Sequence, residues 1–125
     1  MKKIRKFLFS WGPLIIWACF IFALSSQEHI KVSDMKYINI LIFKSLHVIE
    51  YFIFYCLAVY ASIKSKIKEP YLFALYIGIL FALFDEIHQM YVPTREGAFR
   101  DILVDSFGLV LGYYVSRIPI LKKYI

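Results

Sequence analysis

Four long apolar segments occupy most of this 125-residue chain and limit what it can fold into. We expect helices over residues of about 7–25, 38–63, 70–91 and 101–118. A helix needs about 20 mostly apolar residues to cross the hydrocarbon of a membrane. Hydrophobic residues make up 61% of the sequence, whereas soluble domains contain roughly 45–50%. The chain is therefore predicted to be an all-α integral membrane protein, with residues 1–125 forming one four-helix bundle.

The basic residues predict an orientation and argue against a nucleic-acid partner. The net charge is +6, but ten of the fifteen lysines and arginines lie at the N-terminus, at residues 64–68 and at the C-terminal end. Basic clusters beside apolar segments mark the cytoplasmic side of a membrane protein. We therefore expect a multi-pass protein of the plasma membrane with both termini in the cytoplasm (N-in/C-in).

The first apolar segment also has features of a signal peptide, because a basic cluster precedes it. Its run from Phe7 to Leu24 is longer than the usual apolar core of about 7–15 residues, and Ala23-Leu24-Ser25 is a poor cleavage site. We expect an uncleaved first helix.

Polar residues break the apolar pattern most strongly between Asp85 and Asp105, where five carboxylates occur. In the predicted topology, all four helices bring polar side chains to one level near the extracytoplasmic face. Charged groups at such depth are costly and usually functional. The residues expected at this level are Ser25, Ser26 and Gln27, then Lys44, His47, Glu50 and Tyr51, then Asp85, Glu86 and Gln89, and finally Arg95, Asp101 and Asp105.

Helical spacing predicts which of these side chains share a face. Lys44, His47 and Tyr51 are three and four residues apart, as expected for one face of the second helix. Asp85 and Gln89 are four residues apart on the third helix. These spacings predict that the polar groups point into the bundle.

The fourth helix combines its carboxylates with a packing motif. Asp101, Asp105, Gly108 and Gly112 follow one another at intervals of four, three and four residues. Two glycines four residues apart let membrane helices approach closely. We expect this stripe to pack tightly while its carboxylates enter the bundle.

Charges in this polar region do not balance. Leaving aside the basic turn at residues 64–69, the stretch from Lys44 to Asp105 has three basic and six acidic residues, counting histidine as neutral. Excess buried carboxylates must be protonated, bind a cation or pair with a group from outside the chain. A proton relay, a metal site and a cationic ligand all remain open, and the cofactor is unknown.

The same residues, taken in order, resemble the VanZ-like family of small bacterial membrane proteins over essentially the whole chain. Thr94 and Ala98-Phe99 depart from the glycine- and serine-richer turn of that family. The family's name comes from a protein that accompanies glycopeptide-resistance genes and is linked to low-level teicoplanin resistance. The resemblance thus implies a role in the bacterial cell envelope. The matching motifs are Ser25-Ser26-Gln27, Lys44-x-x-His47-x-x-x-Tyr51, Asp85-Glu86-x-x-Gln89, Pro93-x-Arg95-x-Gly97 and Asp101-x-x-x-Asp105-x-x-Gly108-x-x-x-Gly112.

We expect the polar site to bind or process an amphipathic envelope component, such as a lipid-linked cell-wall precursor, with membrane lipids as partners. Asp85, Glu86 and His47 are the candidates for acid–base catalysis. The ligand-binding candidates are Lys44, Glu50, Tyr51, Gln89, Arg95, Asp101, Asp105, Ser25, Ser26 and Gln27.

Other interpretations stay open at this point. The charges can form a structural ion-pair network, or the chain can be a proton- or cation-coupled transporter. Ser25 or Ser26 with His47 would make a nucleophilic site, although the sequence has no GxSxG motif. His47-x-x-Glu50 and Asp85-x-x-His88 have ligand spacing, but neither is HExxH and no zinc-like cluster occurs, so no metal is assigned.

The predicted orientation can be tested by cysteine labelling of Arg95→Cys. We expect this thiol to react with a membrane-impermeant reagent added from outside the cell, because residue 95 precedes the extracytoplasmic start of the last helix. The unchanged chain is the control, since Cys19 and Cys56 both lie within apolar runs. Labelling only from the cytoplasmic side would overturn the topology.

Overall fold

The described residues form four α-helices, α1 (Lys2–Ser25), α2 (Lys36–Lys64), α3 (Pro70–Gln89) and α4 (Phe99–Ser116). This computed structural model describes residues 2–28, 32–93 and 99–118, and those residues contain no strand. The all-α prediction is therefore confirmed. Each helix ends close to its expected limits, except that α1 begins five residues early and includes the N-terminal basic residues.

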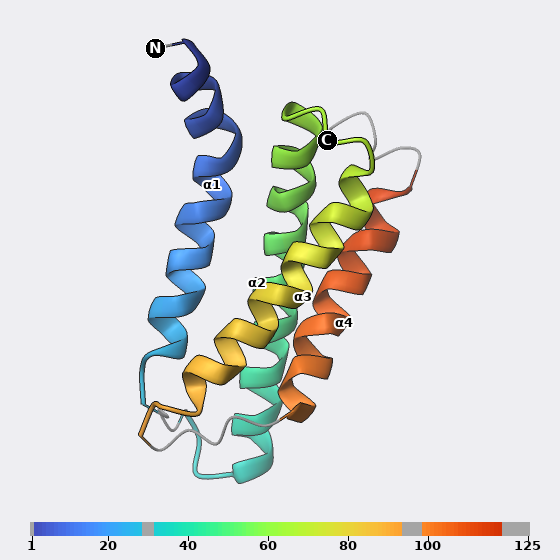
Figure 1. Cartoon of the computed structure of the whole chain (residues 1–125). Coiled ribbons are helices and arrows are strands. Elements are labelled where there is room, and N and C mark those ends of the chain that lie inside the picture. The colour runs from blue at the N-terminus through green and yellow to red at the C-terminus, as the bar shows by residue number, and fades with distance from the viewer. Residues whose placement is uncertain (1, 29–31, 94–98, 119–125) are drawn as a thin grey trace.

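Consecutive helices run in opposite directions, as Figure 1 shows. α1 and α3 therefore end at the same end of the bundle at which α2 and α4 begin. α2 is the central helix, because it packs against α1, α3 and α4, and most extensively against α4. α1 packs mainly on α2 and only slightly on α3.

Local sequence signals define the turn between α2 and α3. Lys66 adopts a left-handed conformation with φ of 58°. Its N–H donates to the Ile63 carbonyl, and the Ile67 N–H donates to the Ser62 carbonyl, each at 3.0 Å. This pair of bonds is the Schellman arrangement that closes many helices. Pro70 then occupies the first position of α3, where its missing N–H leaves no hydrogen bond unmade.

Three of the helices, α1, α2 and α3, are long and apolar enough to cross a membrane. α4 does not meet that description, because Arg100, Asp101 and Asp105 lie within its 18 residues. Many large apolar side chains point outward, including Phe9 and Ile16, which are 68% and 72% exposed. Such an apolar exterior suits a lipid environment and would be a liability in water.

The contact between α2 and α4 depends on two glycines. A Cβ atom at Gly108 would lie 3.1 Å from Tyr51 Cβ and closer still to the backbone oxygen of Val48. At Gly112 it would lie 2.6 Å from Tyr55 Cδ1. Both tyrosines are fully buried against α4. The predicted close approach at the glycine motif is confirmed.

Gly108→Ala is expected to destabilise the bundle. The added methyl group meets a backbone oxygen, which cannot move aside without shifting a helix, and overpacking of this kind costs about 1–3 kcal/mol. Thermal unfolding in detergent, followed by circular dichroism, would show a lower midpoint. Gly12→Ala is the matched control, because nothing lies within 4 Å of a Cβ at that helical glycine. Equal midpoints for the two variants would contradict the close α2–α4 contact.

Candidate functional site

The polar residues gather at one end of the bundle, where α1 and α3 end and α2 and α4 begin (Figure 1). Alternating helix directions bring these four positions to the same level, although they are far apart in the sequence. The buried acidic side chains at this end are Asp85, Glu86 and Asp105. They form two clusters that we describe in turn.

The first cluster joins the end of α1 to the end of α3. Ser25 Oγ donates a hydrogen bond of 2.8 Å to Asp85 Oδ2. Gln89, one turn after Asp85 on α3, donates from Nε2 to the same oxygen at 3.0 Å and to Ser25 Oγ at 3.2 Å. The three residues are 0–5% exposed. This cluster fixes the Asp85 carboxylate in the interior with two donors on one of its oxygens.

The second cluster joins α2 to α4. His47 Nδ1 lies 3.2 Å from Asp105 Oδ1 and 3.7 Å from Glu50 Oε2. His47 and Glu50 are one turn apart on α2, and Asp105 reaches them from α4. Gly108, three residues after Asp105, allows α4 to approach α2 this closely. The helix contact thus positions the Asp105–His47 pair.

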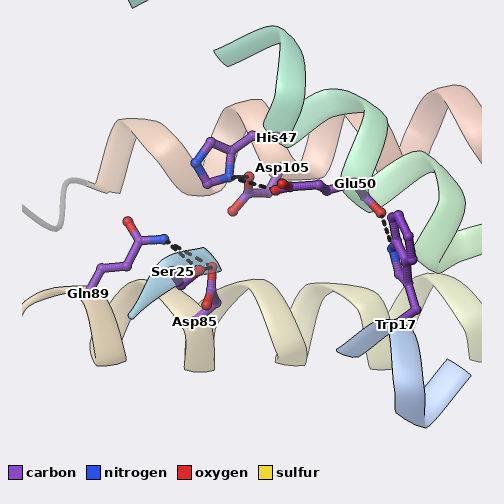
Figure 2. Close-up of polar contacts among 7 residues, drawn as sticks. All are labelled: Trp17, Ser25, His47, Glu50, Asp85, Gln89 and Asp105. Atoms are coloured by element: carbon purple, nitrogen blue, oxygen red, sulfur yellow. Dashed lines mark hydrogen bonds and ion pairs between the residues drawn. The ribbon is translucent and has the colours of Figure 1, made fainter. Parts of the chain in front are cut away.

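The two clusters form one site. Figure 2 shows Ser25, Asp85 and Gln89 on one side and His47, Asp105 and Glu50 facing them on the other. Ser25 of the first cluster and His47 of the second line the same cavity. All four helices therefore contribute to a single polar site.

Several buried polar atoms of the site make no hydrogen bond with any described residue. They are Asp85 Oδ1, both carboxylate oxygens of Asp105, the Tyr51 hydroxyl and His47 Nδ1, whose contact with Asp105 is an ion pair only. Tyr51 is fully buried. A buried polar group without a partner costs about 1–3 kcal/mol. Asp85 Oδ1, Asp105 Oδ2 and the Tyr51 hydroxyl, which also make no ion pair with a described residue, are therefore the atoms open to a partner from outside the chain.

A cavity of about 110 Å³ opens onto this site between α1 and α2. It reaches both clusters, because Ser25 belongs to the first and His47 and Glu50 belong to the second. Since liquid water occupies about 30 Å³ per molecule, the cavity admits a functional group rather than a whole amphipathic molecule. Its lining consists of Leu24, Ser25, Gln27, Glu28, Phe43, Leu46, His47 and Glu50.

The two serines have partners other than the histidine that the nucleophile hypothesis requires. Ser25 is bonded to Asp85, and Ser26 Oγ lies 2.9 Å from His88 Nε2. The His88 ring stacks on Phe22 at 4.2 Å between centroids. No described serine is thus hydrogen-bonded to His47, and the geometry does not support a Ser–His47 nucleophile.

The remaining predicted residues differ in their relation to the site. Glu86 is buried beside it, Asp101 is half-buried one turn before Asp105, and Gln27 lines the cavity although it is exposed. Lys44 is exposed and lines a separate groove between α2 and α4. Arg95 lies outside the described residues. Positions three apart on a helix differ by about 60° in direction, which is enough to separate Lys44 from His47.

One hydrogen bond at the site could not be predicted from the sequence. Trp17, in the middle of α1, donates from Nε1 to the backbone oxygen of Glu50 at 2.9 Å, as Figure 2 shows. A tryptophan within an apolar run is ordinary for a membrane helix, so its polar role is not visible from spacing. It holds α1 against α2 at the site.

The chemistry available here is proton exchange and hydrogen-bond acceptance. Within the described part of the chain, no group of three or more His, Cys, Asp or Glu residues is arranged to hold a metal ion. Carboxylates and an imidazole in contact are the groups that general acid–base catalysis uses. The same oxygens can accept hydrogen bonds from hydroxyl or ammonium groups.

Comparison with known proteins agrees with this architecture. A family model described as VanZ/LLP1 matches residues 9–121 of the chain. Searches of the curated proteins and of the solved structures gave no match. The family match and the three helices long enough to span a bilayer identify a membrane protein. The resemblance found from the motifs is confirmed, and this chain belongs to the VanZ/LLP1 family.

Proposed function

We propose that this membrane protein binds the polar head of an amphipathic component of the bacterial cell envelope, such as a lipid-linked cell-wall precursor. The observation that carries the proposal is a set of buried oxygens that make no hydrogen bond or ion pair with any described residue, Asp85 Oδ1, Asp105 Oδ2 and the Tyr51 hydroxyl. The cavity between α1 and α2 is lined by Ser25 and His47, which contact Asp85 and Asp105 directly. A ligand group entering there would supply the missing donors.

The charges favour a head that is rich in hydrogen-bond donors. The described side chains at the site include several carboxylates and one imidazole, and the exposed Lys44 lines a different surface. Sugar hydroxyls or an ammonium group would bond to these oxygens. If the ligand is also processed, Asp85 and His47 are the groups that would move a proton.

The proposed setting is the plasma membrane, with several helices crossing it, both termini in the cytoplasm and the site near the extracytoplasmic face. A ligand in the outer leaflet would then reach the cavity laterally between α1 and α2. Binding of a cell-wall precursor at this place would connect the chain with glycopeptide sensitivity, and with teicoplanin in particular.

Asp85→Asn is expected to remove this function. The change keeps the shape of the side chain but replaces a charged acceptor, whose hydrogen bonds are worth about 1.5–3 kcal/mol each, so binding should weaken about tenfold or more. Cells lacking the protein, complemented with the wild type or with Asp85→Asn, would be compared for lipid-linked precursors and teicoplanin sensitivity. Only the wild type should restore both, at equal protein levels.

Glu69→Gln is the control for this experiment. Glu69 is an exposed carboxylate just before α3, at the opposite end of the bundle from Asp85. It should complement as the wild type does. Full complementation by Asp85→Asn would reject the binding site and leave the charged cluster as a structural network that fixes the helices.

A second candidate function is proton- or cation-coupled transport. It is favoured by one observation, the position of His47 between the carboxylates of Asp105 and Glu50, with the charge of Asp85 also acting on it. Linked groups of this kind relay protons in membrane proteins.

Transport predicts that purified protein in vesicles moves protons in response to a membrane potential, as read by an enclosed pH dye. His47→Gln and Asp105→Asn would each abolish the signal, while Glu69→Gln would keep it. A wild-type protein that gives no more flux than empty vesicles would exclude this candidate.

A further inference from the structure

Lys44 is a charged residue in an apolar setting and has no ion-pair partner among the described residues. It lies eight residues after the start of α2. This helix is fully described, and its other two basic residues, Lys36 and Lys64, are at its ends. No described residue forms a hydrogen bond or ion pair with it. A lysine within a membrane helix is expensive unless it meets water or an anion.

The surface beside Lys44 is an apolar groove between α2 and α4. It is a shallow, open depression of about 330 Å³, with room for part of one acyl chain. Leu103 and Phe107 form its outer wall and are 61% and 60% exposed. The groove is lined by Lys44, Ser45, Val48, Leu103, Val104 and Phe107.

The groove has a charged end and an apolar end, because the side chains of a helix lean in one direction. Helix side chains lean toward the N-terminus of their helix. The Lys44 stem therefore points toward the start of α2, which lies at the same end of the bundle as the start of α4 (Figure 1). A long lysine stem can lie along apolar surface while its ammonium reaches the polar headgroup level. Val48 and Phe107 continue the groove toward the middle of the bundle.

We propose that this groove is a binding site for an anionic phospholipid, whose phosphate pairs with Lys44 and whose acyl chain lies against Leu103 and Phe107. We infer an anionic headgroup because Lys44, the one charged residue that lines the groove, forms no ion pair with a described residue. The site is separate from the buried carboxylates, and the inference does not depend on the proposed function.

The test is native mass spectrometry of the purified chain released from detergent with added phosphatidylglycerol or phosphatidylcholine. The wild type should retain phosphatidylglycerol at lower lipid concentration than phosphatidylcholine. Lys44→Gln should weaken phosphatidylglycerol retention about fivefold, which corresponds to about 1 kcal/mol for one lysine at an anionic lipid. It should leave phosphatidylcholine unchanged, and Lys44→Arg should keep the preference.

Two matched controls make the outcome specific. Lys68→Gln removes an exposed lysine at the opposite end of α2, beyond its last turn, and should behave as the wild type. Leu103→Trp fills the groove and should reduce retention of both lipids, whereas Leu111→Trp, an exposed position of α4 outside the groove, should not. Since all four side chains are exposed, folding should be preserved, as circular dichroism would verify.

The inference is overturned if Lys44→Gln leaves phosphatidylglycerol retention unchanged, or if it reduces retention of both lipids equally. It is also overturned if Lys68→Gln has the same effect as Lys44→Gln, because the preference would then reflect net charge alone. Displacement of phosphatidylglycerol by a lipid-linked cell-wall precursor but not by more phospholipid would assign the groove to a different occupant.

Discussion

The burial of Asp85 and Asp105 is the constraint on which the rest of this structure depends. A charged residue at the centre of a membrane helix costs about 2.5–3.5 kcal/mol on the lenient insertion scale. A polar contact between membrane helices stabilises the folded protein by only about 0.6 kcal/mol on average. The free energy of burying two carboxylates is therefore not offset by the hydrogen bonds from Ser25 and Gln89 and the contact with His47. Stability alone is a poor reason for them, which favours a function.

Packing and site chemistry are coupled through α2. The glycine at position 108 lets α4 approach the backbone of α2 at Val48, and this approach brings Asp105 within 3.2 Å of His47. On its other side, the carbonyl of Glu50 accepts the Trp17 hydrogen bond from α1. A change in the rotation of α2 would disturb both contacts at once. The central helix thus sets the geometry of the acidic pair as well as the fold.

Sequence reasoning predicted the helices and the level of the polar residues, but not their partners. Apolar segments separated by Pro70 and by basic clusters determine helix number and limits, because length and hydrophobicity suffice for that. Helical periodicity places a residue on a face only to within about 60°. Lys44 and His47 fall within that uncertainty and lie on different surfaces. The Trp17 contact depends on how two helices rotate against each other, which no single-helix pattern contains.

The hydrogen bonds that hold α1 in place end mostly on residues of the site. Only four of its 24 residues are buried, so apolar packing fixes it less firmly than the other helices. Its polar anchors are Ser25 on Asp85, Trp17 on Glu50 and Trp11 on Ser65. Two of these three anchors end on residues of the site, and the cavity lies between α1 and α2. A group that enters the cavity and bonds to Asp85 Oδ1 would share this carboxylate with Ser25, which bonds to Oδ2. Occupancy of the site and attachment of α1 therefore depend on the same carboxylate.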